Sequence, residues 1–190
     1  MLGLLCGKPK LHMHKNLQKA IDRLETQRQK ILSDTGQLSE ERLRFRPDAS
    51  TWSILDILDH LVKVESATLK MVRDNQADGH PIALKDRLGA LMVTTVMKTN
   101  IRVKVPQQAT MVLPTDVAGT AEIFDRWNNL RVSMAALLGE LEGRQLRVGL
   151  FRHPIGGWMN MAQTLGFLSA HLQHHVHQIN RVKALAASKI

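Results

Sequence analysis

The sequence predicts an all-α fold, an antiparallel four-helix bundle with one extra helix and a long crossing loop. Three observations predict it. Aromatic residues make up only 4% of the chain and tyrosine is absent, so the core must be built from Leu, Ile, Val, Ala and the nine Met, which favours helices over strands. Four long stretches place apolar residues at helical spacing. A length of 190 residues suits a single domain over residues 1–190, with one sizeable core and no internal repeat.

The N-terminal part of the chain predicts a loose extension, one long helix and one short one. Residues 1–14 contain two glycines and a proline before any apolar period begins. A long helix is expected over residues 15–32, because apolar residues recur there at helical spacing: Leu17, Ala20, Ile21, Leu24 and Ile31. Gly36 suits its C-terminal cap. Ser39, followed by two acidic residues, caps a short helical turn that Pro47 stops.

The second long helix is predicted from Ser53 to about Val72. Ser53 and Asp56 have the spacing of a capping box ahead of a long apolar run. Residues 82–98 are helical in composition and form the extra helix. Residues 99–115 contain two prolines and no clean period, so they are expected to be an irregular connection that crosses the bundle. A connection of this length is a candidate for lining a site.

The third and fourth long helices complete the predicted bundle. Asp116 suits the cap of a helix that Gly143 ends, and its apolar residues follow a near-heptad pattern: Ile123, Trp127, Leu130, Met134, Leu137 and Leu141. Residues 151–158 are expected to be a turn-rich loop. Asn160 and Gln163 then resemble a capping box for the last helix, whose apolar stripe extends to about residue 182.

Charge and cysteine content restrict the classes of function. The formal net charge is +9 and the pI about 10.1, which would suit nucleic acid, but the basic residues are spread through every segment without interleaved aromatic residues. Nucleic acid is therefore an unfavoured partner. The single cysteine, Cys6, excludes an internal disulfide and fits a reducing cytoplasm. No run is long enough to cross a membrane and the first residues do not resemble a signal peptide, so a soluble cytoplasmic protein is expected.

A histidine-rich stretch near the C-terminus is the strongest functional signal in the sequence. Four of the nine histidines fall within the predicted last helix, at positions 171, 174, 175 and 177. His171 and His175 are an i, i+4 pair, a spacing that lets two imidazoles reach one metal ion. His174 and His177 should point away from that face. His60, at the margin of the second long helix, is the best candidate for a third ligand; the alternative is three helix histidines with ordinary hydrogen bonds.

Several short motifs together resemble the DinB-like (DinB/YfiT) metalloenzyme family of bacterial four-helix bundles, over about residues 15–183. The pieces, in chain order, are Leu38-Ser39-Glu40-Glu41 with Arg46-Pro47, Trp52-Ser53-Ile54 leading into Asp59-His60-Leu61, His153-Pro154 with Gly156-Gly157, and His171-Leu172-Gln173-His174-His175 with Gln178-Ile179. Each piece alone is weak, whereas their order and spacing are fairly specific. The resemblance implies one DinB-like domain with an up-down-down-up bundle.

The resemblance also implies a metal site and a range of activities. The family motif has one histidine on the second helix and an HxxxH pair on the fourth, which correspond here to His60, His171 and His175. It implies a divalent metal, nickel or zinc first and iron or manganese next, with water completing its coordination. Relatives include thiol-dependent transferases and isomerases, metal-dependent hydrolases and DNA-damage-inducible proteins, and many are dimers. A homodimer with a small-molecule substrate is therefore expected.

The residues around this predicted site have competing interpretations. Asp56 either orients His60 or only caps its helix, and the cap is favoured. Gln178 either hydrogen-bonds a ligand or is a plain boundary residue. His153 is a candidate acid or base at the mouth of the site, against the alternative of a His-Pro turn. Trp52 and Trp158 are expected to be core residues; His12, His14 and Cys6 are expected to have no role in the site.

Three hypotheses of function follow. The first is a metal-dependent enzyme, either a hydrolase or a transferase of a low-molecular-weight thiol, with the thiol as an additional cofactor. Acidic groups on such a thiol would suit Arg102 and Lys104 in the crossing loop. The second is a non-catalytic, metal-stabilised stress-response or binding module. The third is a basic protein associated with nucleic acid, whose binding would weaken steeply with salt.

Overall fold

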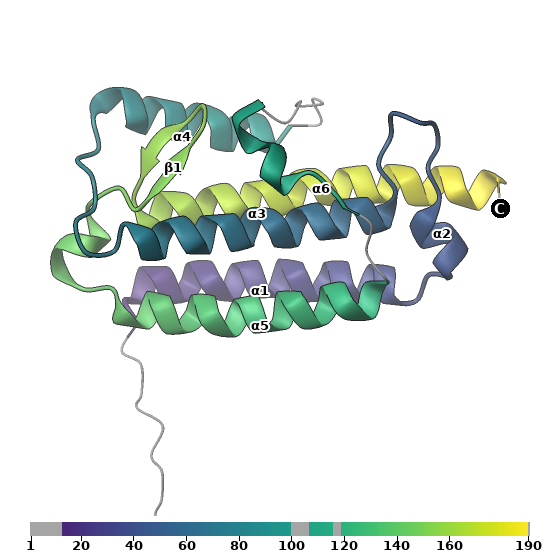
Figure 1. The fold of residues 1–190 in the computed structure, drawn as a ribbon, viewed down its shortest axis with the longest axis horizontal. Coiled ribbons are helices and arrows are strands. Elements are labelled where there is room, and N and C mark those ends of the chain that lie inside the picture. Colours follow the sequence, from purple (N-terminus) through teal and green to yellow (C-terminus); the bar gives the residue numbers. More distant parts are fainter. Residues whose placement is uncertain (1–12, 100–106, 116–118, 190) are drawn as a thin grey trace, which may run out of the picture.

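Four long helices form an up-down-down-up bundle in the computed structural model, which describes residues 13–99, 107–115 and 119–189. They are α1 (Lys15–Gly36), α3 (Ile54–Asp74), α5 (Thr120–Glu140) and α6 (Met161–Lys189). Figure 1 shows that α1 and α6 run in one direction and that α3 and α5 run in the other. The helix α1 contacts α6 and α5, and α3 contacts α6 and α5. The predicted all-α bundle is confirmed.

The predicted apolar stripes meet in one core between these helices. Its largest fully buried side chains come from all four helices and include Leu24, Ile57, Leu61, Ile123, Trp127 and Leu165. Burying such side chains stabilises the fold by about 1.5–3 kcal/mol each. The stripe of α6 carries histidines at its edge because His171 and His175 fall one turn apart beside buried Leu172. The bundle core therefore places the ring nitrogens of α6 against α3.

A buried ion pair crosses the same core between α3 and α5. Glu65 is 1% exposed; its carboxylate accepts hydrogen bonds from Arg131 Nη2 at 2.8 Å and from Trp127 Nε1 at 3.0 Å. The Nε of Arg131 has no hydrogen-bond partner within the described part of the chain but lies 3.7 Å from Glu25 Oε2 on α1. A buried carboxylate is tolerated because it is paired and hydrogen-bonded.

The helix starts agree with the capping signals in the sequence. Ser39 caps α2 (Glu40–Arg44) by accepting from the backbone N–H of Arg42. Ser53 and Asp56 form a complete capping box at α3, and Asn160 and Gln163 form the same reciprocal pair at α6. The helix α1 ends at Gly36, about one turn beyond the predicted range, and Gln37 rather than Gly36 is its C-terminal cap. The predicted cap Asp116 lies outside the described residues, as do Cys6 and His12.

The extra helix and a small hairpin cover one side of the bundle. The helix α4 (Leu84–Met97) contacts α6 and the strand β2 (Gly157–Met159), which pairs antiparallel with β1 (Phe151–His153) (Figure 1). The turn-rich loop predicted at 151–158 is therefore corrected to a turn between two paired strands, which were missed because three-residue strands are too short to show alternation. Gly157 closes this hairpin at φ +72°, where an added Cβ would also collide with Asp86 Oδ1.

Within the described ranges, the remaining elements are two short 3-10 helices, η1 (Gln107–Val112) and η2 (Gly143–Leu146). The first of them packs on α3 and belongs to the connection that was predicted to cross the bundle. His14 caps α1 through its ring Nδ1 and has no part in the histidine cluster. Among the described helices, none is long and apolar enough to span a membrane.

Candidate metal centre

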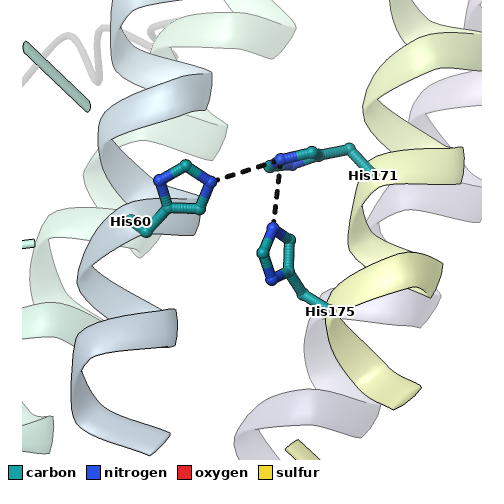
Figure 2. Close-up of side chains that lie close together, drawn as sticks. All are labelled: His60, His171 and His175. Carbon is teal, nitrogen blue, oxygen red and sulfur yellow. Dashed lines mark hydrogen bonds between the residues drawn. The ribbon is translucent and has the colours of Figure 1, made fainter. Parts of the chain in front are cut away.

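Three buried imidazoles converge between α3 and α6. Figure 2 shows His60 on α3 pointing toward His171 and His175 on α6. The Nε2 atom of His171 lies 3.3 Å from His60 Nε2 and 3.2 Å from His175 Nε2, and one ligand atom from each ring falls within 4.8 Å of the others. The structure therefore brings together the three residues that the sequence singled out as metal ligands.

The outer ring nitrogens determine which atoms face the centre. His60 Nδ1 lies 2.8 Å from the carbonyl oxygen of Val112, and His175 Nδ1 lies 2.8 Å from Oε1 of Gln178. Both oxygens only accept hydrogen bonds, so each Nδ1 carries the proton and each Nε2 presents its lone pair to the centre. This pattern of an outer hydrogen bond and an inner lone pair is typical of metal-bound histidines. Gln178 lies where its predicted role requires.

Asp56 does not orient His60, so that interpretation is corrected. Its Oδ2 accepts from the backbone N–H and the hydroxyl of Ser53, both within the capping box, and its Oδ1 accepts from Arg46. The backbone carbonyl of Val112, not Asp56, accepts the hydrogen bond from His60 Nδ1. A carboxylate at the N-terminus of α3 is already stabilised there by the unpaired N–H groups of the first turn.

The donor set fits a divalent ion. His60 and His175 both direct lone pairs at His171, whose Nε2 has at most one proton, so a single N–H cannot satisfy both partners well. A tetrahedral ion with metal–nitrogen bonds of 2.0–2.1 Å places its ligands about 3.3–3.4 Å apart. The two spacings of 3.2 and 3.3 Å are close to that value. Three neutral imidazoles leave positions open for water or substrate, as in catalytic sites.

Electrostatics favours the neutral, ligating form of all three rings. Burial lowers the pKa of His60, and it lowers the pKa of His171 and His175 well below the ordinary value, with a further decrease from the neighbouring histidines. A metal ion binds only the unprotonated nitrogen. The site is therefore built from imidazoles that stay available at neutral pH.

A cavity of about 680 Å³ opens beside the three rings. Its wall is largely apolar, with Met71, Met97 and Phe167 among the lining residues. A concave, mostly apolar site of this volume suits a small organic molecule. The 107–115 segment supplies part of the wall through Met111, Val112 and Leu113, which confirms that this connection lines the site. Arg102 and Lys104, its predicted basic rim, lie outside the described residues.

Trp52 is a site residue that the sequence interpretation missed. Its ring lies 4.9 Å from the His60 ring and is stacked 6.4 Å from the His175 ring, between centroids. It also lines the cavity. Trp52 precedes the cap of α3, so no helical spacing relates it to His60. Trp158, the other tryptophan expected in the core, instead stacks on His80 at 3.8 Å.

His153 has a structural task at the hairpin turn. Its Nδ1 accepts from the backbone N–H groups of Ile155 at 3.1 Å and Gly156 at 2.9 Å, as the alternative of a His-Pro turn predicted. Burial lowers the pKa of His153 to about 4, so the ring is neutral at pH 7. With Nδ1 accepting, the proton sits on Nε2, which has no hydrogen-bond partner among the described residues. The ring contacts Phe167 edge-to-face at 4.8 Å and lines the cavity.

His174 and His177 stay outside the three-histidine cluster but do not point clear of the site. His174 Nδ1 lies 3.1 Å from the carbonyl oxygen of Thr99, and both rings form part of the cavity wall. The prediction that they face away from the site is therefore corrected. The cavity extends along α6 beyond the three-histidine cluster, so histidines that do not belong to the cluster can still line it.

Comparisons with known proteins agree with the fold. A model of the DinB superfamily matches residues 23–179. The "Uncharacterized protein YuaE" of Bacillus subtilis (strain 168) is 22% identical over 146 residues, which cover 77% of this chain and 86% of that protein. The solved structure of YfiT from Bacillus subtilis, described as a probable metal-dependent hydrolase with an unusual four-helix bundle topology, superposes with a TM-score of 0.62 at 17% identity. That match covers 93% of this chain and 91% of YfiT.

Proposed function

The chain belongs to the DinB superfamily, and on that premise we propose that it is a metal-dependent enzyme acting on a small organic substrate. One observation carries the proposal: three buried imidazoles direct their Nε2 atoms at one point on the wall of an apolar cavity. A structural metal site is closed by four protein ligands, so it has no open position that a cavity could serve. The substrate would lie against Met71, Met97 and Phe167 while its reactive group faces the histidines.

Each part of the chain has a separate task in this proposal. A bound divalent ion would supply Lewis-acid chemistry to a water molecule or a substrate heteroatom. Val112 and Gln178 hold the protons of the outer ring nitrogens, so that His60 and His175 remain ligands of fixed tautomer. The apolar side chains of the wall would displace water from the part of the substrate that they contact. The Nε2–H of His153 is a neutral donor for an acceptor oxygen on a bound molecule, so we propose binding rather than base catalysis for this residue.

We propose zinc or nickel as the ion, with iron and manganese as alternatives. An all-imidazole donor set suits zinc, nickel, copper and iron better than the hard cations magnesium and calcium. The spacings of His171 Nε2 from the Nε2 atoms of His60 and His175 are close to those in the tetrahedral geometry that zinc prefers.

Hydrolysis is the reaction that we place first. The description of YfiT as a probable metal-dependent hydrolase supports it, as does the room for water at the open positions. Transfer of a low-molecular-weight thiol is the second candidate. Arg152 and Arg181 line the cavity, and their guanidinium groups suit the carboxylates of such a thiol. The homodimer stays a prediction, since the structure holds one chain.

Turnover by the metal-loaded protein tests the proposal. Zinc-loaded and nickel-loaded chains are assayed with 4-nitrophenyl butyrate for hydrolysis, and with cysteine plus 1-chloro-2,4-dinitrobenzene for thiol transfer. We expect one reaction to depend on the ion, with kcat/KM at least about 100-fold lower in His60→Ala, since loss of a ligand exceeds the effect of losing its hydrogen-bond partner. Equal rates in His60→Ala and wild type would contradict a metal-dependent reaction.

Inactivity of a fully loaded protein in both the hydrolysis assay and the thiol-transfer assay would instead favour the non-catalytic, metal-stabilised module. The nucleic-acid alternative makes a different prediction, namely retention of the chain on DNA with an affinity that falls steeply as salt rises.

A further inference from the structure

We propose that Asp59 and Lys63 are positioning residues for the metal centre. They hold residues 112–115 against α3 and thereby fix the carbonyl group that orients His60. The inference rests on the proposed metal-binding function of the three histidines. It assigns a task to two charged side chains that neither contact the ligands' Nε2 atoms nor line the cavity themselves.

Asp59 and Lys63 are joined to the 112–115 segment by direct contacts. Asp59 is fully buried, and its Oδ2 accepts from the backbone N–H of Thr115 at 3.0 Å. The same oxygen lies 2.8 Å from Lys63 Nζ. Lys63 in turn donates to the carbonyl oxygen of Leu113 and to the hydroxyl of Thr115, both at 2.8 Å. Two side chains one turn apart on α3 therefore hold both hydrogen-bond donors and acceptors of the 112–115 segment.

These contacts determine where the neighbouring carbonyl of Val112 lies. Val112 directly precedes Leu113, and both backbone groups of Leu113 are hydrogen-bonded. Its carbonyl oxygen accepts from Lys63, and its N–H donates to the carbonyl oxygen of Thr110 at 3.0 Å. Asp59 is also adjacent to His60 in sequence, so the segment and the ligand share one rigid turn of helix. The resulting contact, 2.8 Å from Val112 oxygen to His60 Nδ1, fixes both the rotation and the tautomer of the ring.

Burial of Asp59 requires this arrangement of partners. A carboxylate without exposure is costly unless it is paired and hydrogen-bonded. Its Oδ1 is met by Arg126 Nη1 of α5 at 3.1 Å, and its Oδ2 by Lys63 and Thr115. The pairing therefore joins α3, α5 and the segment at one point. Since Met111 and Leu113 line the cavity, the same contacts hold the cavity wall.

Metal binding and the order of the 112–115 segment should consequently be linked. An ion that binds better when His60 is oriented must also stabilise the segment that orients it, by the reciprocity of coupled equilibria. Removing the Lys63 ammonium should weaken metal binding without touching any ligand.

The experiment compares the affinity of the full chain for Zn²⁺ in Lys63→Met, Lys70→Met and wild type, by competition with a chromophoric chelator. Lys70 is the matched control, because it pairs with an acid on the same helix, Asp74, but does not contact the segment. We expect Lys63→Met to bind Zn²⁺ about 10- to 100-fold more weakly and Lys70→Met to stay within about twofold of wild type. Thermal unfolding of the metal-free proteins checks that each variant is folded.

A milder variant and a second readout protect the test against misfolding. Thr115→Val removes only a hydroxyl, which accepts from Lys63 at 2.8 Å and donates to Asp59 Oδ2 at the longer distance of 3.5 Å. It should weaken Zn²⁺ binding about threefold, as for loss of one good hydrogen bond. Hydrogen exchange of the Thr115 amide should slow when Zn²⁺ is added to wild type and respond less in Lys63→Met. Equal Zn²⁺ affinities in Lys63→Met and Lys70→Met, or a Thr115 amide indifferent to Zn²⁺, would overturn the inference alone. A wild-type chain that binds no Zn²⁺ would overturn the proposed function as well.

Discussion

Replacing His171 by alanine is expected to reduce the affinity for Zn²⁺ or Ni²⁺ by at least about 100-fold, since each ligand of a zinc site contributes several kcal/mol of the total binding free energy. His171 is the central member of the cluster, with its Nε2 within 3.3 Å of both other rings. Without it, His60 and His175 remain as two donors from different helices. Titration of the metal-free protein against a chelator of known affinity measures the effect.

Two further variants make this result specific to the cluster. His174→Ala removes a histidine of the same helix whose Nδ1 faces the carbonyl oxygen of Thr99, so it should bind the ion as wild type does. Gln178→Leu removes the oxygen at His175 Nδ1 and should weaken binding about 10-fold, between the other two. An affinity in His171→Ala equal to that of His174→Ala would show that the cluster does not hold the ion.

Replacing Arg131 by methionine is expected to lower the free energy of unfolding by about 3–5 kcal/mol, because it leaves a buried carboxylate without its counter-charge. Glu65 is 1% exposed and would keep only the hydrogen bond from Trp127. Urea unfolding of the metal-free protein at pH 7, followed by circular dichroism, measures the loss.

The pH dependence of Arg131→Met checks the cause. Burial raises the pKa of Glu65 even in the presence of Arg131, so the folded state binds a proton more readily than the unfolded state. Arg131 opposes this rise, so its removal raises the pKa of Glu65 further, whereas the buried histidines titrate alike in variant and wild type. The loss of stability relative to wild type at the same pH should therefore shrink as pH falls from 8 toward the unfolded pKa of about 4.3. The double variant Glu65→Gln, Arg131→Met removes the buried charge but keeps an acceptor for Trp127, and it should recover most of the loss. A double variant as unstable as Arg131→Met would contradict the explanation.

Much of the bundle follows from local signals in the sequence. The stripes predict four long helices, and side chains such as Ser39, Ser53 and Asn160 mark helix starts because a cap depends on residues only three positions apart. The pair His171 and His175 is likewise set by helical geometry alone. These features are local, so they do not require knowledge of which helices are neighbours.

Other features depend on contacts between distant segments. The hydrogen-bond partner of His60 Nδ1 is the backbone carbonyl of Val112. Every residue has such a carbonyl, so the amino-acid sequence does not indicate which one is the partner. Trp52 reaches the site from a loop, and the strand at 157–159 is too short to show the alternation that would have predicted its pairing. Asp56 has the correct spacing to orient His60, but its carboxylate accepts hydrogen bonds in the capping box of its own helix instead. Sequence spacing indicates which groups can meet, whereas competition between partners decides which do.

The metal content of the native protein is the most direct test of a three-histidine metal centre. The chain is purified without a metal-affinity tag, and elemental analysis is performed on it beside a His60→Ala, His171→Ala double variant. We expect about one divalent ion per native chain and none in the double variant, as for a site that needs all three ligands. A native chain that carries no ion, and takes up none after incubation with nickel and zinc, would contradict the metal centre and leave the three histidines as structural residues.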